Sequence, residues 1–262
     1  MNSHEMPDVQ SSHDARDIAI DQVGIKAIRH PMTLVDGDQE QATVAECQLT
    51  VGLPADRKGT HMSRFVALLN ENPLRLSLSG MADWTRAMVD RLEANAGEAH
   101  FTFPYFVRKD APVSGQPAVM DYDVTLSGHL EHGRARTMLK LVIPVTSLCP
   151  CSKEISAYGA HNQRSHITVE TEISDTALAI HDLIAAVEAQ GSCPLWGLLK
   201  RPDEKYITEY AFDNPKFVED MVRDVASALD DFEGINGFEI SVENFESIHN
   251  HSAWAVIRRP AR

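Results

Sequence analysis

Alternation of apolar and polar residues defines the first strand that the sequence predicts. Between Ala42 and Val51, every second residue from Ala45 onward is apolar, and the residues between them are mostly polar. A period of two is typical of a half-buried β-strand. Two further stretches, His100–Val107 and Met120–Leu130, also read as strands. The first half of the chain is therefore expected to supply several strands with one buried face.

Between these strands, the spacing of apolar residues changes to that of a helix. Apolar residues from Met62 to Leu69 recur at the intervals that place them on one helical face. A second helical stripe runs from Met81 to Leu92, and Ser79 is its expected N-cap. Two helices are therefore predicted between the strands of the first half.

The second half contains the same kinds of element in a similar order. One helix is expected to be capped by Asp175, and another to be opened by Asn214 and Pro215. Each half then reads strand–strand–helix–helix–strand–strand, which predicts an α+β fold of tandem modules, each an antiparallel sheet with helices on one face. Open sheet edges favour assembly into barrels through oligomerisation. The strands predicted in this half are Thr137–Val145, Arg164–Ile173, Gly234–Glu243 and Ser252–Arg258.

This pattern divides the chain into three parts. Residues 1–20 are polar at their start and are expected to form a flexible N-terminal arm. Residues 21–132 form the first predicted module. Residues 133–262 form the second, which also carries the segment richest in reactive side chains.

Composition and charge exclude several classes of protein. The 262 residues are 43% hydrophobic and 24% charged, as in a soluble globular chain that can bury a real core. The net charge of −14 argues against general nucleic-acid binding, so a phosphate site would be a local basic patch. No apolar run is long enough to span a membrane, and Met1–Asp17 lacks the apolar core of a secretory signal. With four cysteines and no such signal, the chain is expected in the reducing cytoplasm.

The most reactive segment is the polar stretch 146–166, which connects two of the predicted strands. It holds two cysteines, two histidines and two cations. Cys149 and Cys151 form C-x-C rather than C-x-x-C, so a structural Cys₄ zinc site is poorly supported. A catalytic metal held by a thiolate, imidazoles and a carboxylate stays open, and so does a pair of buried cysteines at a strand end. A tight turn at Gly159 would let His161 fold back toward Cys149.

Other candidates have an ordinary explanation beside the functional one. Glu204 lies in a charged run that would normally be a solvated face, and His249 lies in a His-x-His turn that suits a metal or the surface. Glu219 stands at the edge of an apolar helix face, as a flanking carboxylate or as an acceptor of ligand N–H groups. The loop before the first helix would suit a phosphate, or it is simply solvated. Its cations are Lys58, His61 and Arg64.

Seven segments of the chain match one family over nearly the whole length. They are Asp8–Gln10, Val23–Lys26, Lys58–Phe65, Ser147–Ser156, Tyr158–Ser165, Arg201–Lys205 and Asn214–Asp220. These segments closely resemble the type IB GTP cyclohydrolases of bacterial folate synthesis. The longer ones, such as Ser-Leu-Cys-Pro-Cys-Ser-Lys-Glu-Ile-Ser at Ser147–Ser156, are specific motifs.

The resemblance implies a tunnelling fold with two modules per chain, in a homotetramer whose active sites lie at subunit interfaces. It implies a GTP cyclohydrolase I, which converts GTP and water to formate and 7,8-dihydroneopterin triphosphate in the first step of tetrahydrofolate biosynthesis. It also implies a divalent metal ion, manganese, iron or zinc, because a mixed S, N and O ligand set favours no single metal. The implied metal ligands are Cys149, His161, Glu204 and His249.

The same resemblance suggests roles for the remaining site residues. Glu219 is the implied guanine anchor. Cys149 is expected to be catalytic, and His161 or Glu246 is expected to transfer protons. Some of the cations that bind the triphosphate would come from a neighbouring subunit. These cations are Lys153, Arg164, Lys58, His61 and Arg64.

Two other functions are compatible with the sequence. One is a purine- or pterin-binding enzyme of the same fold, such as a nitrile reductase of deazapurine synthesis, which would use a cysteine nucleophile and NADPH without a metal. The other is a module that binds a metal or nucleotide without turnover. Metal analysis and an NADPH assay separate the first from a cyclohydrolase, and a turnover assay separates the second.

Overall fold

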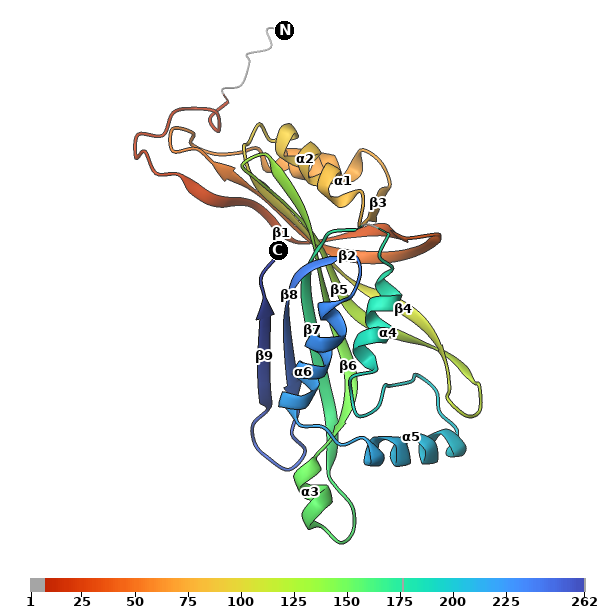
Figure 1. Cartoon of the computed structure of the whole chain (residues 1–262). Helices are drawn as coiled ribbons and strands as arrows, with labels where there is room; N and C mark the ends of the chain where they lie inside the picture. The colour runs from red at the N-terminus through yellow and green to blue at the C-terminus, as the bar shows by residue number, and fades with distance from the viewer. Residues whose placement is uncertain (1–7, 176, 262) are drawn as a thin grey trace. The chain divides into compact units, whose positions relative to one another are not determined.

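The computed structural model (Figure 1) describes residues 8–175 and 177–261. Within these residues the chain forms nine strands and six helices. The strands are β1 (Ile20–Asp36), β2 (Gln39–Leu53), β3 (Leu74–Ser77), β4 (Gly97–Asp110), β5 (Pro117–Glu131), β6 (Arg134–Leu148), β7 (Asn162–Ile173), β8 (Ile235–Asn244) and β9 (Ala253–Arg259). The helices are α1 (Met62–Asn70), α2 (Met81–Arg91), α3 (Pro150–Ile155), α4 (Ile180–Glu188), α5 (Arg201–Asp213) and α6 (Val218–Asp230).

The strands are hydrogen-bonded in the order β3-β1-β2-β4-β5-β6-β7-β8-β9. Antiparallel pairing joins β2 to β4, β7 to β8, and β8 to β9. The short strand β3 instead pairs in parallel with β1, with Met32 opposite Leu74. The predicted α+β class is confirmed, but the expectation of a purely antiparallel sheet is wrong at this edge.

Contacts along the chain define two compact units. Unit 1 contains residues 8–35, 42–103 and 126–138, and unit 2 contains residues 36–41, 104–125, 139–175 and 177–261. In unit 1, α1 packs on α2, and Trp84 meets Phe101 edge to face with 5.0 Å between ring centroids. In unit 2, α6 packs on β8 and β9 and also contacts α4. Each unit thus covers its own part of the sheet with its own helices.

The division of the sequence into modules 21–132 and 133–262 stays a prediction. Of the predicted N-terminal arm, residues 1–7 lie outside the described residues. Residues 8–14 hydrogen-bond to the loop 54–59: the N–H of Gly59 donates to the carbonyl of Gln10 at 3.1 Å, and the N–H of Lys58 donates to Ser12 at 3.0 Å. These hydrogen bonds hold Asp8–Gln10 against the loop 54–59.

The N-caps expected from the sequence differ from those in the structure for α2, α4 and α6. Helix α2 begins at Met81 with Gly80 as its N-cap, and Ser79 is not the cap because its hydroxyl faces that of Ser77 at 3.0 Å. Helix α4 begins at Ile180, five residues after Asp175, whose carboxylate accepts from the N–H of Ala177 instead. Local turns thus use the side chains that the pattern had assigned as caps.

Helix α6 likewise begins later than predicted, at Val218 with Phe217 as its N-cap. Asn214 instead ends α5, and its side-chain amide donates to the carbonyls of Gly191 and Ser192 at 3.1 and 3.2 Å. The strands β1 and β3 and the helices α3 and α5 were not predicted as elements. None of the helices in the described part is long and apolar enough to cross a membrane.

Candidate active site

Cys149 lies where β6 ends and α3 begins. It is the N-cap of α3, and its sulfur accepts from the backbone N–H of Ser152 at 3.4 Å. Pro150 occupies the first turn of the helix, where its fixed φ and missing N–H are tolerated. The thiol is half-buried and is therefore held at a helix terminus without being sealed from ligands.

His161 folds back onto this helix start, as the sequence indicated. The N–H of Cys149 donates to the carbonyl of His161 at 3.1 Å, and the N–H of His161 donates to the hydroxyl of Ser152 at 3.1 Å. The turn between them uses Gly159 at φ +127°, a backbone conformation that favours glycine. The two backbone bonds close the loop and bring the segments that carry the thiol and the imidazole together.

The described hydrogen bonds to the His161 ring are both made at Nδ1. The side-chain carbonyl of Gln163 lies 3.0 Å from Nδ1, and the hydroxyl of Ser247 lies 3.3 Å from it. If Nδ1 carries the proton, Nε2 keeps a lone pair that can bind a metal or accept a proton. Gln163 is buried on β7 and was not singled out from the sequence.

The loop that follows β8 reaches the same place through Ser247. Its start is fixed by two backbone bonds, from Phe245 N–H to the carbonyl of Arg164 and from Glu246 N–H to the carbonyl of Asn244, both 3.0 Å. Farther along, His249 is exposed and stacks on His251 with 5.2 Å between ring centroids. The structure thus brings the neighbour of Glu246 to His161.

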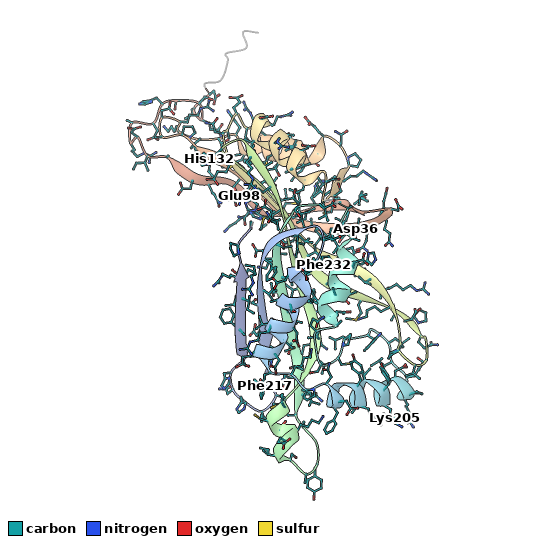
Figure 2. All side chains as sticks on the ribbon, in the orientation of Figure 1. Asp36, Glu98, His132, Lys205, Phe217 and Phe232 are labelled. Carbon is teal, nitrogen blue, oxygen red and sulfur yellow. The ribbon has the colours of Figure 1, made fainter. Side chains whose placement is uncertain are left out.

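The start of α6 is attached to the residue before Cys149. The N–H of Lys216 donates to the carbonyl of Leu148 at 3.0 Å. Glu219 is exposed on the first turn of α6, three residues farther along. Figure 2 shows the N-cap residue Phe217 at the end of α6 nearest α3. Glu219 therefore stands on an element that is anchored to the Cys/His loop.

Glu204 is exposed on the first turn of α5, next to a residue that the sequence analysis missed. Asp203 is fully buried and accepts hydrogen bonds from the N–H groups of Val113, Ser114 and Lys200 at 2.8–2.9 Å and from the hydroxyl of Ser114 at 2.6 Å. Burial acts to raise the pKa of Asp203, but these bonds, that of Ser114 first, outweigh it and hold the pKa below its usual range. Asp203 is the third residue of α5 and follows Pro202. A carboxylate at this position commonly accepts backbone N–H groups at a helix start, so the sequence alone could have indicated this role.

Two predicted triphosphate ligands lie in unit 2. The ammonium of Lys153 donates to the carbonyl of Phe212 and lies 4.3 Å from the centre of its ring. Arg164 is exposed and lines a cavity of about 480 Å³. Asn162, Thr208 and Trp196 also line this cavity. Arg164 thus faces a space with mixed polar and apolar walls, from the strand that begins directly after His161.

The other three predicted cations lie in unit 1, in and just after the loop 54–59. Arg64 pairs with the carboxylate of Glu93 at 2.9 Å, and His61 lies 3.4 Å from a carboxylate oxygen of Asp8. Lys58 is exposed. Because Arg64 and His61 already have acidic neighbours, a phosphate would have to compete with Glu93 and Asp8 for them.

Cys47 and Cys193 are buried, whereas Cys149 is half-buried and Cys151 is exposed. Burial raises the pKa of the thiols of Cys47 and Cys193 to about 11, so both are protonated at neutral pH. Within residues 8–175 and 177–261, no group of three or more His, Cys, Asp or Glu side chains is arranged to hold a metal ion. The ligand set Cys149, His161, Glu204 and His249 stays a prediction.

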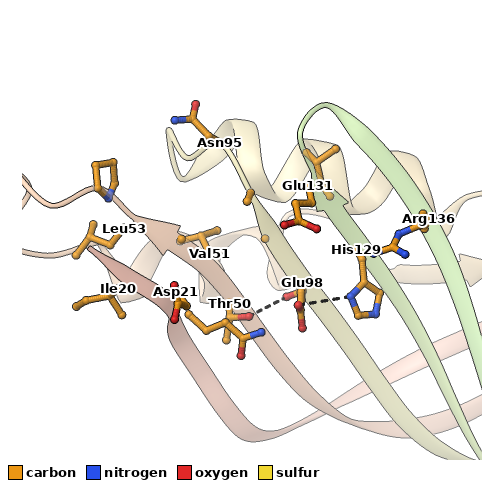
Figure 3. A pocket seen from close by; sticks show the side chains of 16 residues that line it. Ile20, Asp21, Thr50, Val51, Leu53, Asn95, Glu98, His129, Glu131 and Arg136 are labelled. Carbon is orange, nitrogen blue, oxygen red and sulfur yellow. Dashed lines mark hydrogen bonds and ion pairs between the residues drawn. The ribbon is translucent and has the colours of Figure 1, made fainter. Parts of the chain in front are cut away.

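Unit 1 contains a second histidine site, which the sequence analysis missed. We call it the Glu98 cluster: Glu98, His100, Ser127 and His129. The carboxylate of Glu98 lies 3.1 Å from Nε2 of His100 and 3.5 Å from Nδ1 of His129, and the Nδ1 of His100 lies 2.8 Å from the Ser127 hydroxyl. Glu98 and His129 line a cavity of about 610 Å³ together with Asp21, Glu131 and Arg136 (Figure 3).

Comparison with known proteins identifies the family. The family model described as type I GTP cyclohydrolase folE2 matches residues 6–255. The GTP cyclohydrolase FolE2 of Azoarcus sp. is 56% identical over 267 residues, covering 100% of this chain and 99% of that protein. The FolE2 of Paraburkholderia xenovorans is 56% identical over 258 residues, covering 98% and 96%. The chain belongs to the type I GTP cyclohydrolase FolE2 family.

The fold has a more distant counterpart among solved structures. The uricase from Arthrobacter globiformis aligns with a TM-score of 0.50 at 8% sequence identity, covering 91% of this chain and 93% of that chain. At this identity the likeness shows a shared fold alone. It supports a mixed α+β architecture built on a large sheet.

These findings confirm one prediction from the motifs and correct another. The prediction of a GTP cyclohydrolase is confirmed. The assignment to the type IB family is wrong, because the matching family model and the relatives are named type I and FolE2.

Proposed function

We propose that this chain converts GTP and water to formate and 7,8-dihydroneopterin triphosphate, the first step of tetrahydrofolate biosynthesis. The observation that carries the proposal is the bond from the Cys149 N–H to the His161 carbonyl at 3.1 Å, which joins the two ends of the Cys/His loop. In a member of the GTP cyclohydrolase family, this loop is the strongest candidate for the reaction centre.

The residues of the loop suit a divalent metal ion. A thiol at a helix N-cap and an imidazole hydrogen-bonded through Nδ1 are a usual pair of ligand environments in metal sites. Cys149 and His161 would hold the ion together with Glu204 and His249, and this S, N and O set accepts manganese, iron or zinc. When bound, such an ion supplies a Lewis acid that lowers the pKa of water.

Protein side chains would position the purine and move its protons. The Glu219 carboxylate can accept both N1–H and the exocyclic amino group of guanine. Opening the imidazole ring at C8 and releasing formate require proton transfers, for which His161 or Glu246 is the proposed group. Glu246 is adjacent to Ser247, whose hydroxyl lies 3.3 Å from His161 Nδ1.

The triphosphate would be bound by five cations, some of them from a neighbouring subunit. Lys153 would exchange the carbonyl of Phe212 for a phosphate oxygen, and Arg64 would exchange the carboxylate of Glu93. Arg164, Lys58 and His61 complete the proposed set. We further propose a homotetramer that closes the sheets into barrels, has its active sites at subunit interfaces and works in the cytoplasm.

A product assay on the purified full chain tests this function. Metal-stripped protein is given GTP with and without added Mn²⁺, and both formate and oxidised pterin fluorescence are measured. We expect both products only with the metal. Full activity with verified absence of metal would overturn the metal role, and NADPH oxidation without formate would indicate a reductase.

A further inference from the structure

A row of buried polar side chains continues inward from His161. We call it the His161 relay: Gln163, Ser147, Ser165 and Asn244. Gln163 and Ser165 lie on β7, Ser147 lies near the end of the neighbouring strand β6, and Asn244 lies opposite Ser165 on β8. Their exposed fractions are 8%, 0%, 0% and 3% in the order Gln163, Ser147, Ser165, Asn244. Burying four polar side chains is unfavourable unless each finds a partner.

Short hydrogen bonds connect the whole row to the imidazole. Gln163 Nε2 lies 2.7 Å from the Ser147 hydroxyl, which lies 2.7 Å from the Ser165 hydroxyl. The Ser165 hydroxyl lies 2.7 Å from Oδ1 of Asn244. At the other end, Oε1 of Gln163 lies 3.0 Å from Nδ1 of His161. Neighbouring bonds in such a buried network strengthen one another.

The proton count fixes the direction of every bond in the relay. Oδ1 of Asn244 can only accept, so Ser165 gives its single proton to it. Ser165 must then accept from Ser147, and Ser147 must accept from the amide N–H of Gln163. The Gln163 atom that faces His161 is consequently its carbonyl oxygen, which also can only accept. The proton of the neutral imidazole therefore lies on Nδ1.

We propose that Gln163 is a positioning residue that holds His161 in the tautomer protonated at Nδ1, with the lone pair of Nε2 left for the reaction. This inference rests on the proposed function, because in that function Nε2 binds the metal ion or accepts a proton. The relay transmits the constraint from Asn244, which is itself buried on β8. Neither Gln163 nor the relay serines need contact a ligand in this role.

The local sequence of β7 argues against simple packing. The same inward face continues with Ile167 and Val169, which are fully buried and apolar. Gln163 and Ser165, the inward positions nearest His161, depart from this pattern; Thr171 at the far end of the same face is also polar, but its hydroxyl donates to the carbonyl of Gly237 at 2.6 Å. Apolar side chains would fill those positions at lower cost if filling space were all they did.

Metal affinity tests the role without any turnover. Zn²⁺ alone is titrated into the metal-stripped full chain in competition with a chelator. Gln163→Met should weaken Zn²⁺ binding about 10- to 100-fold, as loss of a ligand-orienting group does in other metal sites. Gln163→Glu keeps an acceptor toward Nδ1 and should retain the affinity. Gln190→Met, at a part-buried glutamine at the end of α4, is the matched control and should bind as the wild type does.

The tautomer itself is read by ¹⁵N NMR of histidine-labelled full chain, at a pH about two units above the ordinary histidine pKa of ~6.5. The His161 signals are assigned by their loss in His161→Asn. We expect protonated Nδ1 in the wild type and a mixture of tautomers in Gln163→Met. If Gln163→Met does not fold, Ser165→Ala takes its place, because it breaks the relay without touching His161.

The outcomes separate this inference from the proposed function. A wild-type His161 protonated at Nε2, or equal loss of Zn²⁺ affinity in Gln163→Met and Gln163→Glu, would overturn the positioning role. Wild-type protein that binds no Zn²⁺ would count against the metal role, while the NMR spectra would still decide the tautomer.

Discussion

Two histidine sites in this chain differ in the group that faces the imidazole. His161 in unit 2 faces the neutral amide of Gln163, whereas His100 and His129 in unit 1 share the carboxylate of Glu98. An amide orients a ring without favouring its charged form, whereas a carboxylate stabilises the protonated ring. The first arrangement suits a ligand of fixed direction, and in the second the carboxylate acts to raise the pKa of His129.

Burial separates the two sites further. The His161 relay is closed to solvent, but the side chains of Glu98, His100 and His129 are 32%, 27% and 24% exposed beside an open cavity. Even so, burial is the largest influence on His129 and lowers its pKa, against the opposing effect of Glu98. We therefore place the proposed reaction at the first site and expect a pH-dependent contribution to stability from the second.

Removing the thiol of unit 2 should have the largest effect. Cys149→Ala is expected to reduce formate release from GTP to background, because Cys149 is the half-buried N-cap thiol of α3 and the proposed metal ligand. Cys193→Ala is the control, since the Cys193 thiol is buried with its pKa raised to about 11. The measurement is product formation per folded protein. Equal activities of the two variants would remove Cys149 from the site.

Glu219→Gln should have the next largest effect. A carboxylate accepts both N–H groups of guanine, whereas an amide offers one acceptor and a misplaced donor. We expect a loss of about 1–3 kcal/mol, or roughly tenfold to a hundredfold in kcat/KM. The thermal melt should barely change, because Glu and Gln have similar helix propensity and Glu219 is exposed.

The control for Glu219→Gln is Glu209→Gln, an exposed carboxylate on α5 that pairs only loosely with Lys205 at 3.8 Å. It should leave kcat/KM unchanged. A well-folded Glu219→Gln protein with wild-type kinetics would mean that another residue holds the guanine.

The sequence predicted what depends on local patterns. The alternation before Val51 and the stripe from Met62 to Leu69 correspond to β2 and α1. The fold-back of His161 was expected from the glycine turn. These features follow from residues near one another in the chain, where the period of burial and the turn residues are visible directly.

The sequence could not show what long-range contacts decide. Gln163 reads as one more polar residue in a motif, and only its register beside Ser147 and Asn244 makes it part of a relay. Glu98 and His129 lie on β4 and β5, thirty-one positions apart, and meet only in the folded sheet. Ser79 and Asp175 were misplaced as caps because a turn can use the same side chains.

Neutralising Glu98 should sharpen the contrast between the two sites. Glu98→Gln removes the charge that two imidazoles share, at a site with partial solvent exposure. The loss in free energy of unfolding should be below about 1 kcal/mol, as for other solvent-screened pairs. Formate release should be unchanged, because no step of the proposed reaction uses this cluster. A large fall in kcat/KM with normal stability would break the comparison and make the Glu98 cluster a functional site.

The smallest expected effect is a change in the pH dependence of stability at His129. Its pKa in the folded chain is lowered, chiefly by burial and also by His100 and Arg136, while Glu98 acts in the opposite direction. The unfolded chain, with an ordinary histidine pKa of ~6.5, therefore takes up the proton first as pH falls. Stability is fully present above that pH and is lost as pH falls toward the folded pKa.

His129→Gln cannot take up this proton, so its unfolding free energy should fall less between about pH 7.5 and 5.5 than that of the wild type. Urea unfolding at several pH values measures the two curves. The unfolding free energy of the variant should still fall somewhat with pH, because the pKa of His166 in unit 2 is also lowered, chiefly by burial. Parallel curves for the two proteins would show that His129 has the same proton affinity folded and unfolded. In that case the carboxylate of Glu98 fully offsets burial, and His129 contributes nothing to the pH dependence of stability.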